Sequence, residues 1–356
     1  MGMNYGRRVE RLQRLMGDGG LRAFVLYTRE NLMYFTGFDR YESTAYLLIP
    51  LDGDPILYVT RLDYQRALDE AFGCRVKRCR RPLNTLSRDL TALGGGSVGV
   101  DDLPSSTYTK LQATRRVNLK PSDRVVWRLR SVKEDEEVKL ISEACKIACA
   151  GMEAVWEALR PGLRECELAG EACRAMMRMG SEEQSFPTIV ASGPRSAYPH
   201  GGCTRRRLRK GELVVVDLGA SYMGYKSDMT RTFVAGRPSD RQVEAWRATL
   251  EAYTRGLKAM SVGVRAGEVD REARRVLEER GFGRFFIHGL GHGVGLSVHE
   301  PPYITKASGD RLSRGNVVTC EPGVYIPGFG GVRLENTVLV SRDGVEELTR
   351  FPMELC

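Results

Sequence analysis

Residues 1–125 alternate short apolar runs with segments of helical periodicity. Four runs rich in β-branched and aromatic residues predict strands, namely RAFVLYT, STAYLLIP, PILYVT and VGVDD. The segments LDYQRALDEAF and SSTYTKLQATRR repeat their apolar positions at helical spacing and predict helices. This alternation predicts an α/β domain for residues 1–125.

The pattern changes after this first domain, where a basic stretch leads into a much longer helical segment. Over Ser131–Leu159 apolar residues recur at helical spacing, and acidic residues occupy the first turn, where the helix dipole favours them. A second helix, ECELAGEACRAMMRMG, follows, and strand pairs come next. Helices are predicted over about 240–281, and strands from there to the end. We therefore predict a second domain, of the α+β class, for residues 126–356.

The composition is that of a soluble globular protein. The chain is 42% hydrophobic and 28% charged, and no apolar run approaches the roughly 20 residues that span a bilayer. The first segment, MGMNYGRRVERLQRLM, lacks the apolar core of a signal peptide and predicts an amphipathic helix. We therefore expect a cytoplasmic protein.

The net charge of +9 raises the question of a nucleic-acid partner. Basic residues are densest in CTRRRLRKGE, but no nucleic-acid motif accompanies them and the strand-like run LVVVDLGA follows directly. A solvated basic turn is therefore favoured over a nucleic-acid contact. The nine cysteines form no CxxC pair, and the spacing of Cys145 and Cys149 is typical of a helix face rather than of a metal pair.

The chain has four histidines, and three of them lie within HGLGHGVGLSVHE. The fourth, His200, lies in SGPRSAYPHGG. This clustering favours a metal or acid–base site over histidines that merely fill the core. If the segment is extended, His288 and His292 share a face about 13 Å apart, and His299 has the opposite parity. At most one of these three is then expected to bind an ion, which leaves the others for the substrate and the transition state.

Two aspartates lie on a predicted hairpin, ELVVVDLGASYMGYKSDMTRTFVAG, with its turn near Tyr222–Gly224. A fold at residues 222 and 223 sets Asp217 directly opposite Asp228, and a small change of turn moves the pair to a diagonal. Like charges on neighbouring strands are destabilising, and Asp217 is the one charged residue in the apolar run LVVVDLGA. A buried acid pair requires a shared proton or a cation.

The same design recurs in TCEPGVYIPGFGGVRLENTVLV. Glu321 and Glu335 flank a reversal rich in Pro and Gly and lie on two further strand-like runs. Four carboxylates and one histidine carry four negative charges, which two divalent cations would neutralise. Such an oxygen-rich set suits Mn, Co, Fe or Zn, and it does not suit a thiolate zinc site.

These motifs resemble the proline-specific metallopeptidases of the pita-bread fold, which include prolidase (Xaa-Pro dipeptidase) and aminopeptidase P. In the second domain SFPTIVASGPRSAYPHG, VVVDLGASYMGYKSDMTRTF, HGLGHGVGLSVHE, CEPGVY and VRLENTVLV follow one another in the expected order. In the first domain RENLMYFTGF resembles the creatinase-type N-terminal domain. The resemblance implies an α/β N-terminal domain followed by an α+β pita-bread catalytic domain.

The resemblance also implies two divalent metal ions per chain, Mn or Co ahead of Zn or Fe. The ligands that it implies are Asp217, Asp228, His292, Glu321 and Glu335. In this scheme Asp228 and Glu335 bridge the two ions. The other implied site residues are His200, His288, His299 and Arg333, with Phe186 in the proline pocket.

The implied reaction is hydrolysis of Xaa-Pro bonds by a hydroxide held between two metal ions. Glu321 is expected to shuttle a proton to the leaving proline nitrogen. His299 is expected to stabilise the oxyanion, and His200 to help hold the substrate. Because the substrate's proline nitrogen has no N–H, the pocket must recognise the ring by apolar and aromatic walls.

A dipeptidase is favoured, and an aminopeptidase P that takes longer Xaa-Pro-Xaa peptides is the main alternative. The free carboxylate of a dipeptide needs a cation or donors close by, for which Arg333, His200 or an arginine of a partner subunit are candidates. Arg333 could instead pair with an acid of the metal site. The resemblance implies a homodimer. A non-catalytic binding protein on the same scaffold is disfavoured by the complete ligand set.

Overall fold

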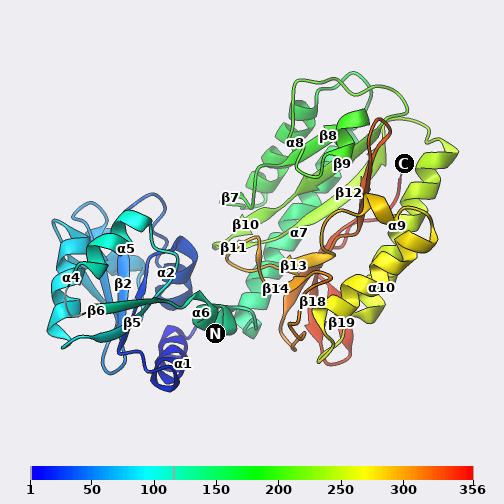
Figure 1. The fold of residues 1–356 in the computed structure, drawn as a ribbon. Coiled ribbons are helices and arrows are strands. Elements are labelled where there is room, and N and C mark those ends of the chain that lie inside the picture. Colours follow the sequence, from blue (N-terminus) through cyan, green and yellow to red (C-terminus); the bar gives the residue numbers. More distant parts are fainter. Residues whose placement is uncertain (1, 115–116, 356) are drawn as a thin grey trace. The chain divides into compact units, whose positions relative to one another are not determined.

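The structure is a computed structural model that describes residues 2–114 and 117–355. The chain divides into two compact units, Met1–Arg130 and Ser131–Cys356 (Figure 1). The division falls a little after residue 125, where the sequence suggested it, because helix α6 (Asp123–Arg130) packs against α1 (Tyr5–Asp18). The expected α/β domain followed by an α+β domain is confirmed.

The first unit contains a mixed six-stranded sheet in the order β4-β3-β2-β1-β5-β6. Its strands are β1 (Ala23–Leu26), β2 (Tyr46–Pro50), β3 (Ile56–Val59), β4 (Arg75–Arg78), β5 (Gly96–Val100) and β6 (Val117–Pro121). The other helices are α2 (Arg29–Thr36), α3 (Tyr64–Glu70), α4 (Pro82–Ala92) and α5 (Ser105–Gln112).

The four predicted strands correspond to β1, β2, β3 and β5, and the amphipathic first helix is α1. The sequence did not indicate β4, with the sequence RVKR, or β6, with the sequence VNLKP. Both are edge strands that carry charged and polar residues, so they lack the apolar run that marks a buried strand. The predicted helix over residues 105–116 is α5, and its last two predicted residues lie outside the described part of the chain.

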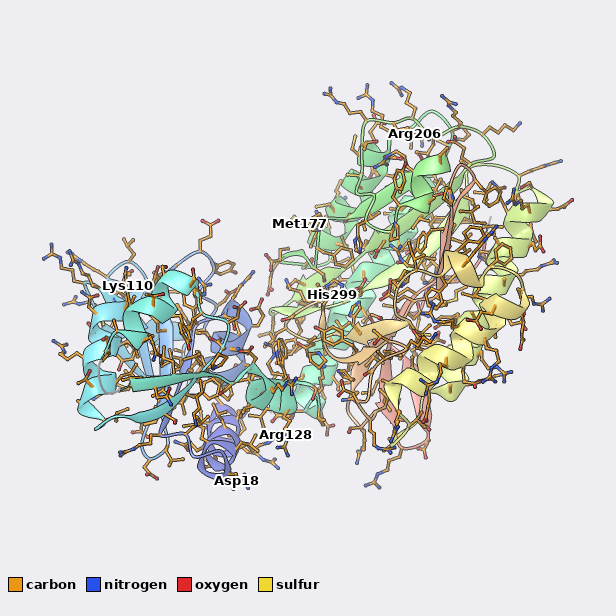
Figure 2. The ribbon with its side chains drawn as sticks, in the orientation of Figure 1. Asp18, Lys110, Arg128, Met177, Arg206 and His299 are labelled. Carbon is orange, nitrogen blue, oxygen red and sulfur yellow. The ribbon has the colours of Figure 1, made fainter. Side chains whose placement is uncertain are left out.

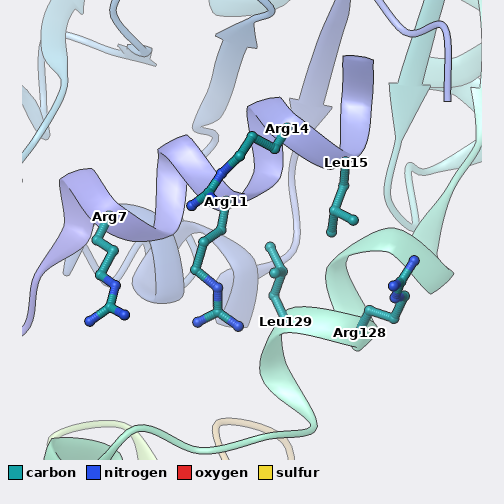
Figure 3. A pocket seen from close by; sticks show the side chains of 6 residues that line it. All are labelled: Arg7, Arg11, Arg14, Leu15, Arg128 and Leu129. Atoms are coloured by element: carbon teal, nitrogen blue, oxygen red, sulfur yellow. The ribbon is translucent and has the colours of Figure 1, made fainter. Parts of the chain in front are cut away.

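Part of the positive charge lies on the first unit. Arg7, Arg11 and Arg14 recur on one face of α1 and, with Arg128 and the side chains of two leucines, line a cavity of about 560 Å³ (Figure 3). Guanidinium groups alone provide neither a nucleophile nor a metal ligand. This cavity is therefore not a candidate active site.

The second unit packs two pairs of helices against antiparallel strands. Helices α7 (Asp135–Ala158) and α8 (Glu165–Arg178) form one core with β8 (Ile189–Ser192), β9 (Leu213–Leu218) and β12 (Met229–Val234). Helices α9 (Asp240–Ala259) and α10 (Ala266–Glu279) form another with β15 (Val317–Cys320), β16 (Gly323–Ile326), β17 (Gly330–Arg333) and β18 (Asn336–Ser341). The remaining strands are β7 (Glu183–Gln184), β10 (Ala220–Tyr222), β11 (Tyr225–Lys226), β13 (Gly291–Gly293), β14 (Glu300–Ile304) and β19 (Gly344–Glu347).

The aspartate hairpin has a register different from the first one predicted. Its turn is Met223–Gly224, with both residues at positive φ (47° and 77°) as a tight two-residue hairpin turn requires. Asp217 consequently pairs with Thr230, so the prediction of a directly opposed Asp217–Asp228 pair is wrong. Asp228 lies two residues before Thr230, in the diagonal position that the sequence left as the second possibility.

Among the described residues, no helix is both long and apolar enough to cross a membrane.

Candidate metal centre

A cavity of about 940 Å³ lies in the second unit and gathers the predicted site residues. Its lining includes Phe186, His200, Asp217, Asp228, His288, His292, His299, Glu321, Arg333 and Glu335. Figure 2 labels His299 in this region. Residues up to 149 positions apart in the sequence, from 186 to 335, thus face one space.

Five strands present the five implied ligands. Asp217 lies on β9, and His292 is the central residue of β13. The other three lie at strand ends: Asp228 directly precedes β12, Glu321 directly follows β15, and Glu335 directly precedes β18. Because Cys320 pairs with Asn336, the two glutamates meet at one end of the β15–β18 ladder, as their positions around the Pro- and Gly-rich reversal predict.

Three of these side chains have the geometry of a metal-binding group. One ligand atom each from Asp228, His292 and Glu335 lie within 4.8 Å of one another, and all three residues are buried. Nδ1 of His292 donates to the carbonyl of Gly293 at 3.0 Å, so Nε2 donates to Glu321 when the ring is protonated and offers its lone pair to a cation when the ring is neutral. Nε2 lies 3.7 Å from Oδ2 of Asp228 and 3.2 Å from Oε1 of Glu321.

The charges of the cluster fit a cation. Burial raises the pKa of Asp228 and of Glu335 well above the usual carboxyl range, and neighbouring carboxylates raise both further. Oδ1 of Asp217 is buried and has no hydrogen-bond partner. A buried carboxylate oxygen without a donor is costly unless a cation lies beside it. The donor set therefore fits divalent metal ions.

Glu321 differs from the other acids of the cluster. Burial opposes its ionisation, but the hydrogen bond from His292 and the charges of His292, His288 and Arg333 prevail and lower its pKa to about 2. Glu321 is thus held in its ionised form.

Arg333 and a tyrosine absent from the sequence prediction form a second layer behind the ligands. Nη2 of Arg333 donates to Oδ2 of Asp217 at 2.6 Å, and Nη1 donates to the Tyr325 hydroxyl at 2.7 Å. That hydroxyl lies 2.9 Å from Nε2 of His288, whose Nδ1 donates to the carbonyl of Gly289. Burial raises the pKa of Tyr325 to about 12, so it stays a phenol that donates to His288.

The sequence offers a weak signal for Tyr325, since GVYI reads as an ordinary buried strand. Thr230 was missed for a similar reason. Its hydroxyl donates to Oε2 of Glu335 at 2.6 Å and accepts from Nε of Arg333 at 3.0 Å. Thr230 holds the proposed ligand Glu335 in place, and Tyr325 holds His288 and Arg333. Neither residue changes the apolar pattern by which strands are recognised.

The remaining predicted residues lie around the ligands. The ring of His299 is 4.2 Å, centroid to centroid, from that of His292, and both His299 and His200 are exposed. Phe186, Ile287 and Tyr303 line the cavity with apolar surface, and Ile287 and Tyr303 are exposed to 64% and 43%. These walls are suited to an apolar group of a ligand.

Comparison with known proteins agrees with this geometry. Residues 139–342 match Metallopeptidase family M24, and residues 8–132 match the Creatinase/Prolidase N-terminal domain. The fold and the site define a metal-dependent peptidase. The chain belongs to metallopeptidase family M24, and the expected pita-bread fold of its catalytic domain is confirmed. It is therefore an enzyme of a family that employs divalent metal ions.

The particular relatives are proline-specific. The chain is 38% identical to the Xaa-Pro dipeptidase of Pyrococcus furiosus over 98% of its own length and 99% of that protein. The prolidase structure from Pyrococcus horikoshii OT3 superposes with a TM-score of 0.93 at 35% identity, covering 98% of this chain and 100% of that one. An X-Pro aminopeptidase from Thermotoga maritima MSB8 superposes with a TM-score of 0.87 at 31% identity, covering 97% and 99%.

Proposed function

We propose that this enzyme is a dinuclear-metal Xaa-Pro dipeptidase, a prolidase. The observation that carries the proposal is the buried group of Asp228, His292 and Glu335 beside the unpartnered oxygen of Asp217. This donor set occurs in a chain that matches Xaa-Pro dipeptidases over nearly its whole length. The proposed ligands are Asp217, Asp228, His292, Glu321 and Glu335.

Bound divalent ions would activate a water for attack near neutral pH and polarise the scissile carbonyl. Glu321, which the hydrogen bond and charge of His292 keep ionised against the effect of burial, accepts the proton of the attacking water and returns it to the proline nitrogen. His299, next to His292, donates a hydrogen bond to the carbonyl oxygen as negative charge develops there. His288, fixed by Tyr325, and His200 complete the walls against which the substrate lies.

The proposed proline pocket is the apolar part of the cavity, which includes Phe186 and Tyr303. A proline nitrogen in a peptide bond offers no N–H, so ring shape is what the enzyme can recognise. Flat aromatic walls select that shape with little entropy loss of their own.

A dipeptide is the proposed substrate, with longer Xaa-Pro-Xaa peptides as the alternative. The carboxylate of a dipeptide must find a donor near the metal site. Arg333 already donates from each of its three nitrogens, to Thr230, Tyr325 and Asp217. His200, exposed at the cavity, or an arginine of a partner subunit is therefore the better candidate for the carboxylate.

Mn or Co is the proposed metal, and Fe or Zn is the alternative, since four carboxylates and one imidazole suit all four ions. A homodimer and a cytoplasmic location are also proposed, both from the resemblance and composition of the sequence.

A nucleic-acid partner is not part of the proposal, because two of the arginines of the basic turn are engaged within the unit. Arg206 pairs with Glu212, and Arg207 donates to the carbonyl of Gly162.

The test is hydrolysis of a panel of Xaa-Pro dipeptides by protein stripped of metal and reloaded with Mn²⁺ or Co²⁺. Release of free proline that depends on the metal is the expected result, with Leu-Ala as a control peptide that is cleaved poorly. Equal cleavage of Leu-Ala and Leu-Pro would contradict proline specificity. No hydrolysis with any of four metals (Mn, Co, Fe, Zn) would contradict the enzyme assignment itself.

A further inference from the structure

His200 enters the cavity on a long connection between β8 and β9. The connection leaves β8 at Ser192, and both Ser192 and Thr204 donate hydrogen bonds to Glu165. His200 is exposed, and within the described residues its imidazole makes no hydrogen bond. What fixes the place of His200 is therefore the backbone on either side of it.

Glu165, the first residue of α8, holds the chain at two points, Ser192 before His200 and Thr204 after it. It is fully buried, and Oε1 accepts from the backbone N and the hydroxyl of Ser192 at 2.9 and 2.8 Å. Oε2 accepts from the backbone N and the hydroxyl of Thr204 at 3.0 and 2.6 Å. Nη1 of Arg195 adds a fifth bond at 2.5 Å. One carboxylate thus joins Ser192 and Arg195, which precede His200, to Thr204, which follows it.

Arg195 extends the link to the neighbours of His200. Its Nη2 donates to the carbonyl of Gly201, the residue that follows His200. The N–H of Gly201 donates to the carbonyl of Tyr198 at 3.0 Å and closes the turn that contains Pro199 and His200. The histidine is therefore carried by a turn whose far side is bonded, through Arg195, to Glu165.

We propose that Glu165 is a positioning residue of the active site, whose carboxylate sets the place of His200 through Arg195. The effect on catalysis rests on the proposed function, in which His200 contacts the substrate. An ionised carboxylate can accept all five hydrogen bonds. The side-chain amide of glutamine has one oxygen that accepts, and its NH₂ group would face some of the five donors without being able to accept from them. Charge-assisted bonds of this kind are shorter and stronger than neutral ones. Glu165 contacts none of the proposed metal ligands, so its influence passes through the connection.

The first experiment is Glu165→Gln in the full chain loaded with Mn²⁺. Metal content should match that of the parent, while kcat/KM on Leu-Pro should fall on the order of 10- to 100-fold, mainly through KM. Hydrogen exchange of the amides over residues 193–204 should become faster. The matched control is Glu171→Gln, on the same helix, whose carboxylate pairs with Arg174 on the exposed surface. It should leave metal content, exchange and kinetics unchanged.

A double-mutant cycle tests the route through His200. If Glu165 acts through this histidine, adding Glu165→Gln to His200→Ala should cost little beyond His200→Ala alone. If the fold-loss of kcat/KM in the double variant equals the product of the losses in the two single variants, Glu165 and His200 act independently, and the proposal is overturned.

Arg195→Gln covers the case in which Glu165→Gln does not fold. It removes the bond to the Gly201 carbonyl and leaves Glu165 its four bonds to Ser192 and Thr204. The same faster exchange over 193–204 and a raised KM are expected. Parent-like exchange in both variants, or faster exchange with an unchanged KM, would overturn the proposal. A parent that cleaves no Xaa-Pro peptide would refute the proposed function instead, and exchange would still decide whether Glu165 holds the connection.

Discussion

Nη2 of Arg333 lies 2.6 Å from Oδ2 of Asp217, and both residues are buried. The guanidinium also donates to Thr230 and Tyr325, so a substrate carboxylate could bind it only by displacing bonds already made. Through these contacts Arg333 orients Asp217. It also supports the Thr230 hydroxyl, which donates to Glu335, and the Tyr325 hydroxyl, which contacts His288. Its position favours the role of an ion-pair partner for the metal site over that of a substrate anchor.

Arg333→Lys tests this role. Lysine cannot reproduce the fork that joins Asp217 to Tyr325, so metal affinity should fall by about 10- to 100-fold. The ratio of kcat/KM for Leu-Pro to that for Leu-Pro amide should stay that of the parent when metal is saturating. Arg350→Lys, at an exposed pair with Glu346, is the control. A variant that keeps its metal but loses the preference for a free carboxylate would show that Arg333 anchors the substrate.

Asp228→Asn tests the buried ligand group. The substitution keeps the volume and removes a charge that both proposed ions share. We expect loss of at least one metal ion and of nearly all activity, with an unchanged circular dichroism spectrum. Asp343→Asn, at the exposed turn between β18 and β19, should behave as the parent does. Full activity with two ions per chain in Asp228→Asn would refute the ligand assignment.

Glu321→Gln tests the proton transfer. The amide cannot take up a proton near neutral pH, so kcat should fall by roughly 10²- to 10⁴-fold. Metal content is measured in parallel, because Glu321 is also a proposed ligand. If the variant retains both ions and turnover is nearly that of the parent, Glu321 has a structural role alone.

Substrate length separates a dipeptidase from an aminopeptidase P. Leu-Pro should be cleaved with a higher kcat/KM than Leu-Pro-Gly, because a third residue would leave the group that binds the carboxylate without its partner. Steady-state kinetics on the two peptides with the same metal provide the comparison. A preference for Leu-Pro-Gly would move the assignment to aminopeptidase P and leave the metal site unchanged.

Removal of metal should make stability depend on pH. Burial and mutual repulsion raise the pKa of Asp228 and Glu335, so above the unfolded carboxyl pKa of about 4 the folded chain binds more protons than the unfolded one. Stability of the metal-free protein should therefore fall as pH rises through this window. The low pKa of Glu321 has the opposite effect, because it makes stability rise with pH. That rise is confined to the range from about pH 2, the folded pKa of Glu321, to roughly pH 4.3, its unfolded pKa.

The measurement is Tm with EDTA and with Mn²⁺ from about pH 5 to about pH 7, above the unfolded carboxyl pKa of about 4. Tm should fall with pH in EDTA and stay flatter with Mn²⁺, since a bound cation stabilises the ionised acids of the folded state. Asp228→Asn, with one fewer raised carboxyl, should show a shallower fall in EDTA. Parallel curves with and without metal would contradict the electrostatic account.

Much of this protein can be predicted from its sequence, because the decisive signals are local. Apolar runs indicate four strands of the first domain and the strand pairs of the second, and a lone acid within LVVVDLGA indicates a buried charge. Four histidines gathered near glycines and four acids on strand-like runs indicate metal chemistry. Each inference depends on residue type and spacing along one segment, which a single sequence displays directly.

Tertiary structure alone decided how these segments meet. Two left-handed residues, Met223 and Gly224, set the hairpin register and place Asp217 opposite Thr230 rather than Asp228. The side chains behind the site, such as Tyr325, come from strands whose pattern is that of any core strand. Their hydrogen bonds join residues up to 116 positions apart, as between Arg333 and Asp217, and depend on how whole sheets pack. Residue spacing along the chain carries no record of such contacts, because packing, and not sequence separation, brings the two partners together.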